Sequence, residues 1–515
     1  MPNRSADILF QLIKSLEKGE KRHFKLYIQR SSGKSDLKIV RLFDAIDRLV
    51  DYDEKLLLKR LPGFTKPQLA NLKNHLYKEI MSSLRLLKSE DSIDLQLSEL
   101  FDNAHILYKK GLFLQSLRYI ARAKEMAHAH QKLNIMPLLL SLEKRIESLH
   151  ITRNVQFKAS ELAEEVNEVN KQIERLGRLS NLALKLFGWF VEHGHARNEE
   201  DEKDVRQFLK ESLPTDAWEL PGFYERLYLY QSMTWYAFIR QDFLQYYRYT
   251  QKWVDLFTQQ PEMIRVETGH YIKAIHQLLN AHFDLRNHRR FKETLKLFES
   301  VAQLDRVKEN DNFRVQCFIY ISTAKINQHF MIGTFSVGVK MIPSMKKDLS
   351  RYDMFIDSHH ALVLNYKFAM LYFGSGDFNR CIDHLLPIIN SNSNLRYDLQ
   401  CYARLLHLLA HYELGNDVLM ESLTKSVYRF LSKMKNFTVV EEAMLNFLRK
   451  SIKLSSKQLN PAFQELLDQI KHLEKNRFQT RAFAYLDVIS WLEAKLSGQS
   501  MEKVIHGKYL QSQHR

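Results

Sequence analysis

The sequence predicts an all-α protein: a solenoid of stacked helical hairpins behind a small basic N-terminal helical region. Glycine and proline are scarce, with 16 and 10 in 515 residues, so the chain contains few of the usual turn residues. Apolar residues recur along the chain with the period of an amphipathic helix, and no sustained alternating strand pattern is present. A pattern of small and aromatic residues around a turn also recurs at long intervals, as in arrays of helical units.

The N-terminal region, residues 1–92, holds much of the positive charge. Residues 1–90 contain 19 Lys and Arg against 11 Asp and Glu, so this stretch supplies +8 of the net +16. A basic end favours a nucleic acid or an acidic partner, although a solvated surface has the same composition. The helices predicted here cover 5–19, 21–29, 36–51, 54–61 and a stretch from Thr65.

The helix expected from Thr65 follows a Pro62-Gly63 turn and completes a helix–turn–helix outline. Its apolar residues are spaced to bury one face, at Leu69, Leu72, Leu76, Ile80 and Leu84. The opposite face shows amide and basic side chains, which are able to contact base edges and phosphates. An ordinary surface helix shows the same residue types, so both interpretations remain open. The candidate nucleic-acid contacts are Asn71, Lys73, Asn74 and Lys78.

The recurring unit is clearest between Leu100 and Ala127. Two amphipathic halves meet at Gly111, and they are followed at fixed offsets by Phe113, Ser116, Ile120 and Ala123. This arrangement resembles the tetratricopeptide repeat (TPR), a helix–turn–helix unit with small and aromatic residues at set positions. The same register predicts five further turns: Gln241 with Phe243, Arg289 with Phe291, Gly333 with Phe335, Gly376 with Phe378, and Gly415 with Asp417. We expect the phenylalanines at 113, 243, 291, 335 and 378 to be buried at these turns.

The resemblance implies degenerate TPR-like repeats over residues 93–450, followed by capping helices and a tail over 451–515. Between positions 243, 291, 335, 378 and 417 the gaps are 48, 44, 43 and 39 residues. A consensus unit has about 34 residues, so helices or loops are longer here. The run HYELGNDVLMESLTKSVYRFL, from His411, is also similar to a group of uncharacterised bacterial helical-repeat proteins, a similarity that brings no known activity.

The resemblance further implies a binding face, because the first helix of each TPR unit lines the concave surface. Aromatic and amide side chains on that face suit a peptide segment of a partner protein. The alternative is that the aromatic residues pack between neighbouring units; 14 of the 40 residues from Trp218 to Phe257 are aromatic. The predicted partner-binding residues are Tyr228, Gln231, Trp235, His276, Asn280, Tyr320, Asn327, Tyr366 and Lys367.

No catalytic, metal-binding or cofactor motif is present, so the sequence predicts a protein that is not an enzyme and needs no cofactor. Only His407 and His411 are spaced to place two metal ligands on one helix face, and no third ligand accompanies them. Gly33-Lys34-Ser35 lacks both the first glycine and the preceding strand of a phosphate-binding loop. No serine-nucleophile elbow or dinucleotide-binding fingerprint occurs.

The cysteines and the hydropathy pattern predict a cytoplasmic protein. Cys317, Cys381 and Cys401 are odd in number and widely spaced, as in a reducing compartment. No stretch approaches the roughly 18 apolar residues of a membrane helix, and no signal-peptide core is present. We therefore expect a non-catalytic protein–protein interaction scaffold without membrane insertion. The alternative is a nucleic-acid-binding regulator whose TPR-like region acts as a sensor; no sequence feature specifies an oligomeric state.

Overall fold

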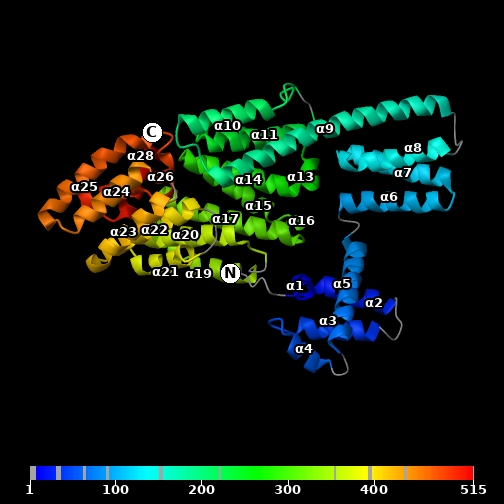
Figure 1. Cartoon of the computed structure of the whole chain (residues 1–515), viewed down its shortest axis with the longest axis horizontal. Helices are drawn as coiled ribbons and strands as arrows, with labels where there is room; N and C mark the ends of the chain where they lie inside the picture. Colours follow the sequence, from blue (N-terminus) through cyan, green and yellow to red (C-terminus); the bar gives the residue numbers. More distant parts are fainter. Residues whose placement is uncertain are drawn as a thin grey trace. The chain divides into compact units, whose positions relative to one another are not determined.

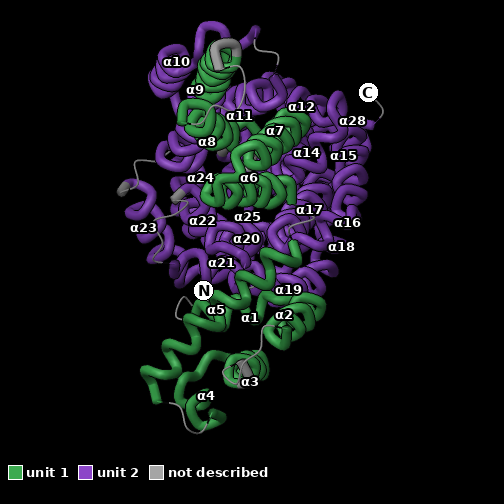
Figure 2. The backbone as a smooth tube through the Cα atoms, turned by 90° about the vertical axis from the view of Figure 1, so that its right-hand side faces the viewer, with its two compact units in different colours: residues 1–174 green, residues 175–515 purple. Residues whose placement is uncertain are grey.

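The computed structural model describes residues 7–30, 36–61, 65–88, 92–149, 155–219, 222–352, 355–391, 397–433 and 438–513. All regular secondary structure in these ranges is helical, with no strand, so the prediction of an all-α protein is confirmed (Figure 1). None of the described helices combines the length and the apolar character needed to cross a membrane. The chain divides into two compact units, residues 1–174 and 175–515 (Figure 2).

The first part of unit 1 is a small bundle with its own apolar core. Asp7 caps the first helix, since its carboxylate accepts hydrogen bonds from the backbone N–H groups of Leu9 and Phe10 at 3.0 and 3.2 Å. The apolar face predicted from Thr65 packs as expected, with Leu69, Leu76 and Ile80 buried. The Pro62-Gly63 turn lies outside the described residues. The helices are α1 (Ile8–Ser15), α2 (Lys18–Arg30), α3 (Asp36–Asp47), α4 (Glu54–Arg60) and α5 (Lys66–Lys88).

The second part of unit 1 contains the hairpin on which the repeat pattern was clearest. The Ser116 hydroxyl donates a 2.7 Å hydrogen bond to the Ala104 carbonyl, and both residues are fully buried. Small side chains at these positions let the two helices approach closely. The elements are α6 (Ile93–Lys109), α7 (Phe113–Ala129), the 3-10 helix η1 (Leu133–Ile135), α8 (Met136–Leu149) and α9 (Val155–His193). Helix α9 begins in unit 1 and continues into unit 2.

Unit 2 consists largely of successive helical hairpins, each packed against the next. Helix α20 has apolar residues on all sides, because helices contact it from several directions. The helices of the unit are α10 (Glu199–Ser212), α11 (Phe223–Ile239), α12 (Phe243–Gln259), α13 (Glu262–Val266), α14 (Thr268–Asp284), α15 (His288–Val301), α16 (Asp305–Lys308), α17 (Asp311–Ile332), α18 (Phe335–Val339), α19 (Ile342–Arg351), α20 (Ser358–Ser375), α21 (Phe378–Ile389), α22 (Tyr397–Glu413), α23 (Asp417–Lys433), α24 (Val439–Ser451), α25 (Ser456–Lys471), η2 (His472–Lys475), α26 (Thr480–Tyr485), α27 (Val488–Ser497) and α28 (Met501–Gln513).

The hairpin turns share one backbone feature, a residue with positive φ just before the second helix. Five of the six turns lie where the register predicted them, and the residues are Gly111, Gln241, Gly333, Gly376 and Gly415, with φ of 75°, 55°, 69°, 87° and 68°. Phenylalanine begins the second helix at positions 113, 243, 335 and 378, where it is buried or half-buried.

The third turn was predicted in the wrong place. The left-handed residue is Arg286, with φ of 52°, and not Arg289. Helix α15 begins at His288 because the Asn287 side chain caps it, accepting a hydrogen bond from the Arg290 N–H at 3.2 Å. Phe291 is therefore fully buried one turn inside the helix rather than at its first residue.

The end of the chain packs back onto the middle of unit 2. Helix α28 contacts α17 and α20 as well as its neighbour α27. The His506 imidazole Nδ1 lies 2.9 Å from the Ile332 carbonyl oxygen, and the Ser336 N–H donates to the Glu502 carboxylate at 3.0 Å. Residues 451–513 thus belong to the same compact unit as the hairpins before them.

Candidate binding pocket in the second unit

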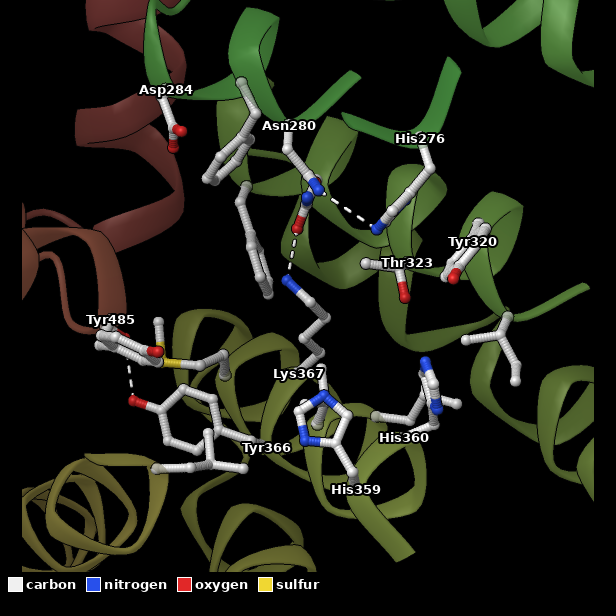
Figure 3. Close-up of a pocket in the computed structure, with 18 of the residues that line it drawn as sticks. His276, Asn280, Asp284, Tyr320, Thr323, His359, His360, Tyr366, Lys367 and Tyr485 are labelled. Carbon is white, nitrogen blue, oxygen red and sulfur yellow. Dashed lines mark hydrogen bonds between the residues drawn. The ribbon is translucent and has the colours of Figure 1, made fainter. Parts of the chain in front are cut away.

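A pocket of about 330 Å³ lies among helices α14, α17 and α20 (Figure 3). This volume is at the lower end of the range of about 300–1,000 Å³ that is usual for ligand sites. Its walls are largely apolar, with Phe238, Phe243, Phe283 and Phe330 among the lining residues. Polar side chains reach it from each of the three helices, so the pocket combines apolar area with groups that can orient a ligand.

Six of the nine predicted partner-binding residues line this pocket, namely His276, Asn280, Tyr320, Asn327, Tyr366 and Lys367. Residues three or four apart, or seven apart, lie on one face of an α-helix. His276 and Asn280 therefore share a face of α14, and Tyr320 and Asn327 share a face of α17. The register placed these faces on the same side of successive hairpins, and the structure brings them together around one cavity.

The other three predicted residues, Tyr228, Gln231 and Trp235, do not line the pocket. Trp235 is only 9% exposed, and its indole ring contacts Phe187 and Phe190 of α9 at centroid distances of 5.0 and 5.5 Å. Gln231 is buried and Tyr228 is half-buried. Helix α9 packs on this face of α11, so Trp235 is a core residue.

The stacked pair of His276 and Tyr320 forms one wall of the pocket. Their rings lie 3.9 Å apart and only 10° from parallel. The Asn280 amide donates to the His276 Nε2 atom at 3.2 Å. Burial, together with the positive charges of nearby side chains, lowers the pKa of His276 to about 3. The imidazole is therefore neutral at physiological pH and accepts the hydrogen bond from the amide.

Lys367 places an ammonium group in the middle of the pocket (Figure 3). Its Nζ atom donates to the Asn327 amide oxygen at 2.6 Å and lies 5.6 Å from the centre of the Phe330 ring. A second charge comes from Asp284, the last residue of α14. Burial raises the pKa of Asp284 to about 7, although Arg286 and Lys367 favour its ionised form. The lining of the pocket thus includes one lysine and one aspartate beside its four histidines.

Residues near the C-terminus close one side of the pocket. The Tyr366 hydroxyl donates to the Tyr485 carbonyl oxygen at 2.9 Å, and Tyr485 itself lines the cavity. The Tyr485 ring stacks on Tyr402 at 4.5 Å and 6°, and its hydroxyl donates to Asp398 at 2.6 Å. These contacts hold α26 against α20 and α22.

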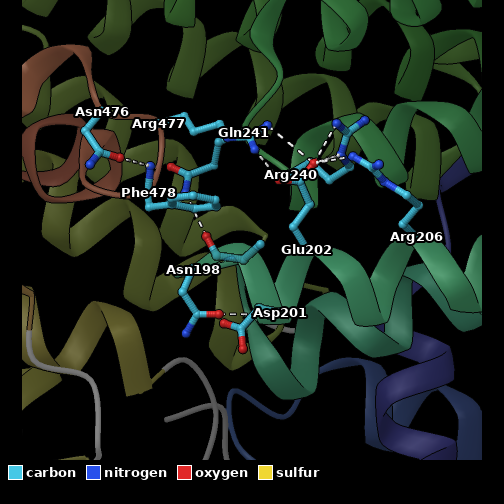
Figure 4. A network of polar contacts seen from close by, with 10 residues as sticks. Asn198, Asp201, Glu202, Arg206, Arg240, Gln241, Asn476, Arg477 and Phe478 are labelled. Atoms are coloured by element: carbon cyan, nitrogen blue, oxygen red, sulfur yellow. Dashed lines mark hydrogen bonds and ion pairs between the residues drawn. The ribbon is translucent and has the colours of Figure 1, made fainter.

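A buried carboxylate anchors the segment that leads into α26 (Figure 4). Glu202 of α10 is 4% exposed and pairs with three arginines, at 3.1 Å for Arg206, at 2.7 Å for Arg240, and in a further contact with Arg477. Burial alone would raise the pKa of Glu202, but the hydrogen bond from Arg240 and the arginine charges lower it. Thr480 also donates to the Gln241 amide oxygen at 2.9 Å. The segment before α26 is therefore tied to α10 and to the α11–α12 turn.

Sequence reasoning missed Asp284 and Tyr485 for different reasons. Asp284 continues the spacing of His276 and Asn280 by one further helical turn, so the pattern that identified those two extends to it. Tyr485 lies 119 residues from Tyr366, and no local pattern connects them.

The four residues of the nucleic-acid alternative lie on α5, where Asn71, Asn74 and Lys78 share one face and Lys73 packs into the bundle. Lys73 donates to Asp7 and, at 2.9 Å, to the Tyr52 hydroxyl, and its side chain is only 16% exposed. Asn71, Asn74 and Lys78 are exposed on α5. The other basic residues of this helix pair with acidic side chains: Lys66 with Glu54, Arg85 with Asp102, and Lys88 with Glu20.

Within the described residues, no group of three or more His, Cys, Asp or Glu side chains is placed to hold a metal ion. His407 and His411 meet edge to face at 4.5 Å, and burial lowers the pKa of His407 to about 4. No protein-family model matches the chain, and no curated protein matches its sequence. The fold therefore defines an all-α protein of packed hairpins, and the pocket is the feature from which a function can be argued.

Proposed function

We propose that this chain is a non-catalytic, TPR-like solenoid that binds a peptide segment of a partner protein in the pocket among α14, α17 and α20. One observation carries the proposal. His276 and Asn280, Tyr320 and Asn327, and Tyr366 and Lys367 come from the first helices of three successive hairpins and line a single cavity. In a solenoid, equivalent residues of stacked units form a continuous binding surface of this kind.

The chemistry of the pocket suits a peptide. Its phenylalanine and tyrosine rings provide large, rigid contact areas, which concentrate binding energy in protein interfaces. Asn280 and Asn327 offer amide groups, and Lys367 offers an ammonium group, for the polar atoms of a bound chain. A cavity of about 330 Å³ has room for a side chain or two rather than for a whole domain.

The hairpin turns support the TPR-like part of the proposal. A left-handed residue precedes the second helix of six hairpins, and the buried positions after it recur at the same offsets. In each of the six hairpins, the fifth residue after the left-handed residue is buried. These residues are Ser116, Tyr246, Phe291, Gly338, Cys381 and Met420. The nucleic-acid alternative has less support, because Lys73 is paired with Asp7. Two further basic residues of α5, Arg85 and Lys88, also form ion pairs with acidic side chains of the chain itself.

A peptide-display selection on the full-length protein tests the proposal. Lys367→Met keeps much of the side-chain volume but removes the charge from the pocket, and Lys347→Met makes the same change at an exposed position on α19. We expect selected peptides to bind the wild type and Lys347→Met equally. Binding to Lys367→Met should be at least about tenfold weaker, equivalent to about 1.4 kcal/mol. Failure to select any peptide, or equal affinity for both variants, would refute the proposal.

A further inference from the structure

Asp284 is the carboxylate that lines the pocket, and its side chain is half-buried. Within the described part of the chain, its pKa is set by burial and by the charges of Arg286 and Lys367, with no hydrogen bond among the causes. Lys367 donates a hydrogen bond to Asn327, Asn280 donates to His276, and Tyr366 donates to Tyr485. A carboxylate that is taken from bulk water and left without a partner is costly. A cationic group of a bound ligand would offset this cost by pairing with the carboxylate.

The surroundings of Asp284 indicate which ligand group fits. Phenylalanine side chains at positions 238, 243, 283 and 330 line the same pocket, so much of the nearby surface is aromatic. Aromatic ring faces attract cations, and long basic side chains lay their hydrocarbon stems along apolar surfaces. An acidic group within aromatic walls is a suitable environment for an ammonium or guanidinium group.

We propose that Asp284 receives the cationic end of a Lys or Arg side chain of the bound peptide, whose stem lies along the phenylalanine walls. This inference rests on the proposed function and specifies the peptide side chain that enters the pocket. The ligand cation donates a charge-assisted hydrogen bond to the Asp284 carboxylate. Lys367 acts on Asp284 through its charge, and its ammonium group donates a hydrogen bond to Asn327.

Binding of a cation should be linked to proton release. The unoccupied carboxyl has its pKa raised to about 7, so it is substantially protonated at and below neutral pH. A ligand cation favours the ionised form and lowers this pKa, so binding releases a proton and affinity rises between about pH 5.5 and 8. The charged and titratable groups that interact with Asp284 are Arg286, Lys367 and Tyr246. The pocket histidines, His195, His276, His359 and His360, are present in both the wild type and Asp284→Asn, so a difference between the two proteins reports on Asp284.

Two defined peptide libraries test the inference on the full-length protein. One has the form acetyl-XXKXX-amide and the other replaces the central lysine with norleucine, which is uncharged; X excludes Lys and Arg in both. Equimolar libraries are passed over immobilised protein, and the retained peptides are quantified by mass spectrometry. The tightest lysine peptide and its norleucine twin are then measured by isothermal titration calorimetry, in buffers of different ionisation enthalpy, at several pH values.

We expect the wild type to bind the lysine peptide at least about tenfold more tightly than its twin, with proton release near pH 6.5. Asp284→Asn has almost the same shape and should lose both the preference and the proton release. If that variant fails to fold, the comparison of the two peptides and the proton count on the wild type still decide the matter. Peptides that depend on Lys367 but bind equally with lysine or norleucine would overturn this inference alone. If no peptide binds the Lys367→Met variant more weakly than the wild type, the proposed function and this inference are both overturned.

Discussion

Two glycines at equivalent turns should respond very differently to alanine. Gly333 and Gly376 both end the first helix of a hairpin in the left-handed conformation, with φ of 69° and 87°. A Cβ atom at position 376 has nothing within 4 Å. A Cβ atom at position 333 would overlap the backbone nitrogen of His506 and lie 2.9 Å from the Glu502 carbonyl oxygen. The extra atom at Gly333 therefore collides with the backbone of α28.

The magnitudes follow from these two situations. A non-glycine residue in the left-handed conformation costs about 1 kcal/mol, and this is the whole expected effect of Gly376→Ala. Gly333→Ala carries the same backbone cost. Its second cost comes from pushing α28 away, and overpacking of this kind typically destabilises by about 1–3 kcal/mol. We therefore expect about 2–4 kcal/mol for Gly333→Ala and about 1 kcal/mol for Gly376→Ala.

Urea unfolding of the full-length variants, followed by circular dichroism, measures the overall difference. Since the chain has two compact units, hydrogen exchange provides the more local test. The amides of α28 should exchange faster in Gly333→Ala than in the wild type, whereas Gly376→Ala should leave them unchanged. Equal destabilisation by the two substitutions, with unchanged exchange in α28, would refute the packing of the C-terminal helix against this turn.

Two further predictions concern buried residues of unit 2. Trp235→Ala removes a ring packed against Phe187 and Phe190 and should cost about 3–5 kcal/mol in urea unfolding; a loss below about 1 kcal/mol would contradict its place in the core. Glu202→Gln should destabilise the protein at neutral pH, because a buried charge network loses its anion. The pKa of Glu202 is lowered on folding, so its contribution is present above the ordinary value of 4.5 and is lost as the pH falls below it. Urea midpoints from pH 6 to pH 3 should therefore fall more steeply in the wild type than in Glu202→Gln, and parallel curves would count against this role.

Local features of the sequence determined the helices and most of the turns. The spacing of Leu69, Leu76 and Ile80 specifies an amphipathic helix, because burial on one face requires that period. Glycine marks turns such as those at 333 and 376, because only a residue without a Cβ adopts a left-handed backbone freely. The predicted position of the third turn was wrong because it was located from Phe291, which lies one turn inside its helix, whereas Gln241 was located from Phe243, which begins its helix.

The pocket was only partly determined by the sequence. Helical spacing placed His276 with Asn280, and Tyr320 with Asn327, because a helix face is a local property. The burial of Trp235 depends on α9, the wall at Tyr485 depends on the returning C-terminal segment, and the pairing of Lys73 depends on Asp7, which is 66 residues away. Contacts between distant segments arise from how whole helices pack, and packing uses shape and area that no short stretch of sequence specifies. The tertiary structure alone therefore decided which of the aromatic and basic side chains are core, which are paired, and which line a pocket.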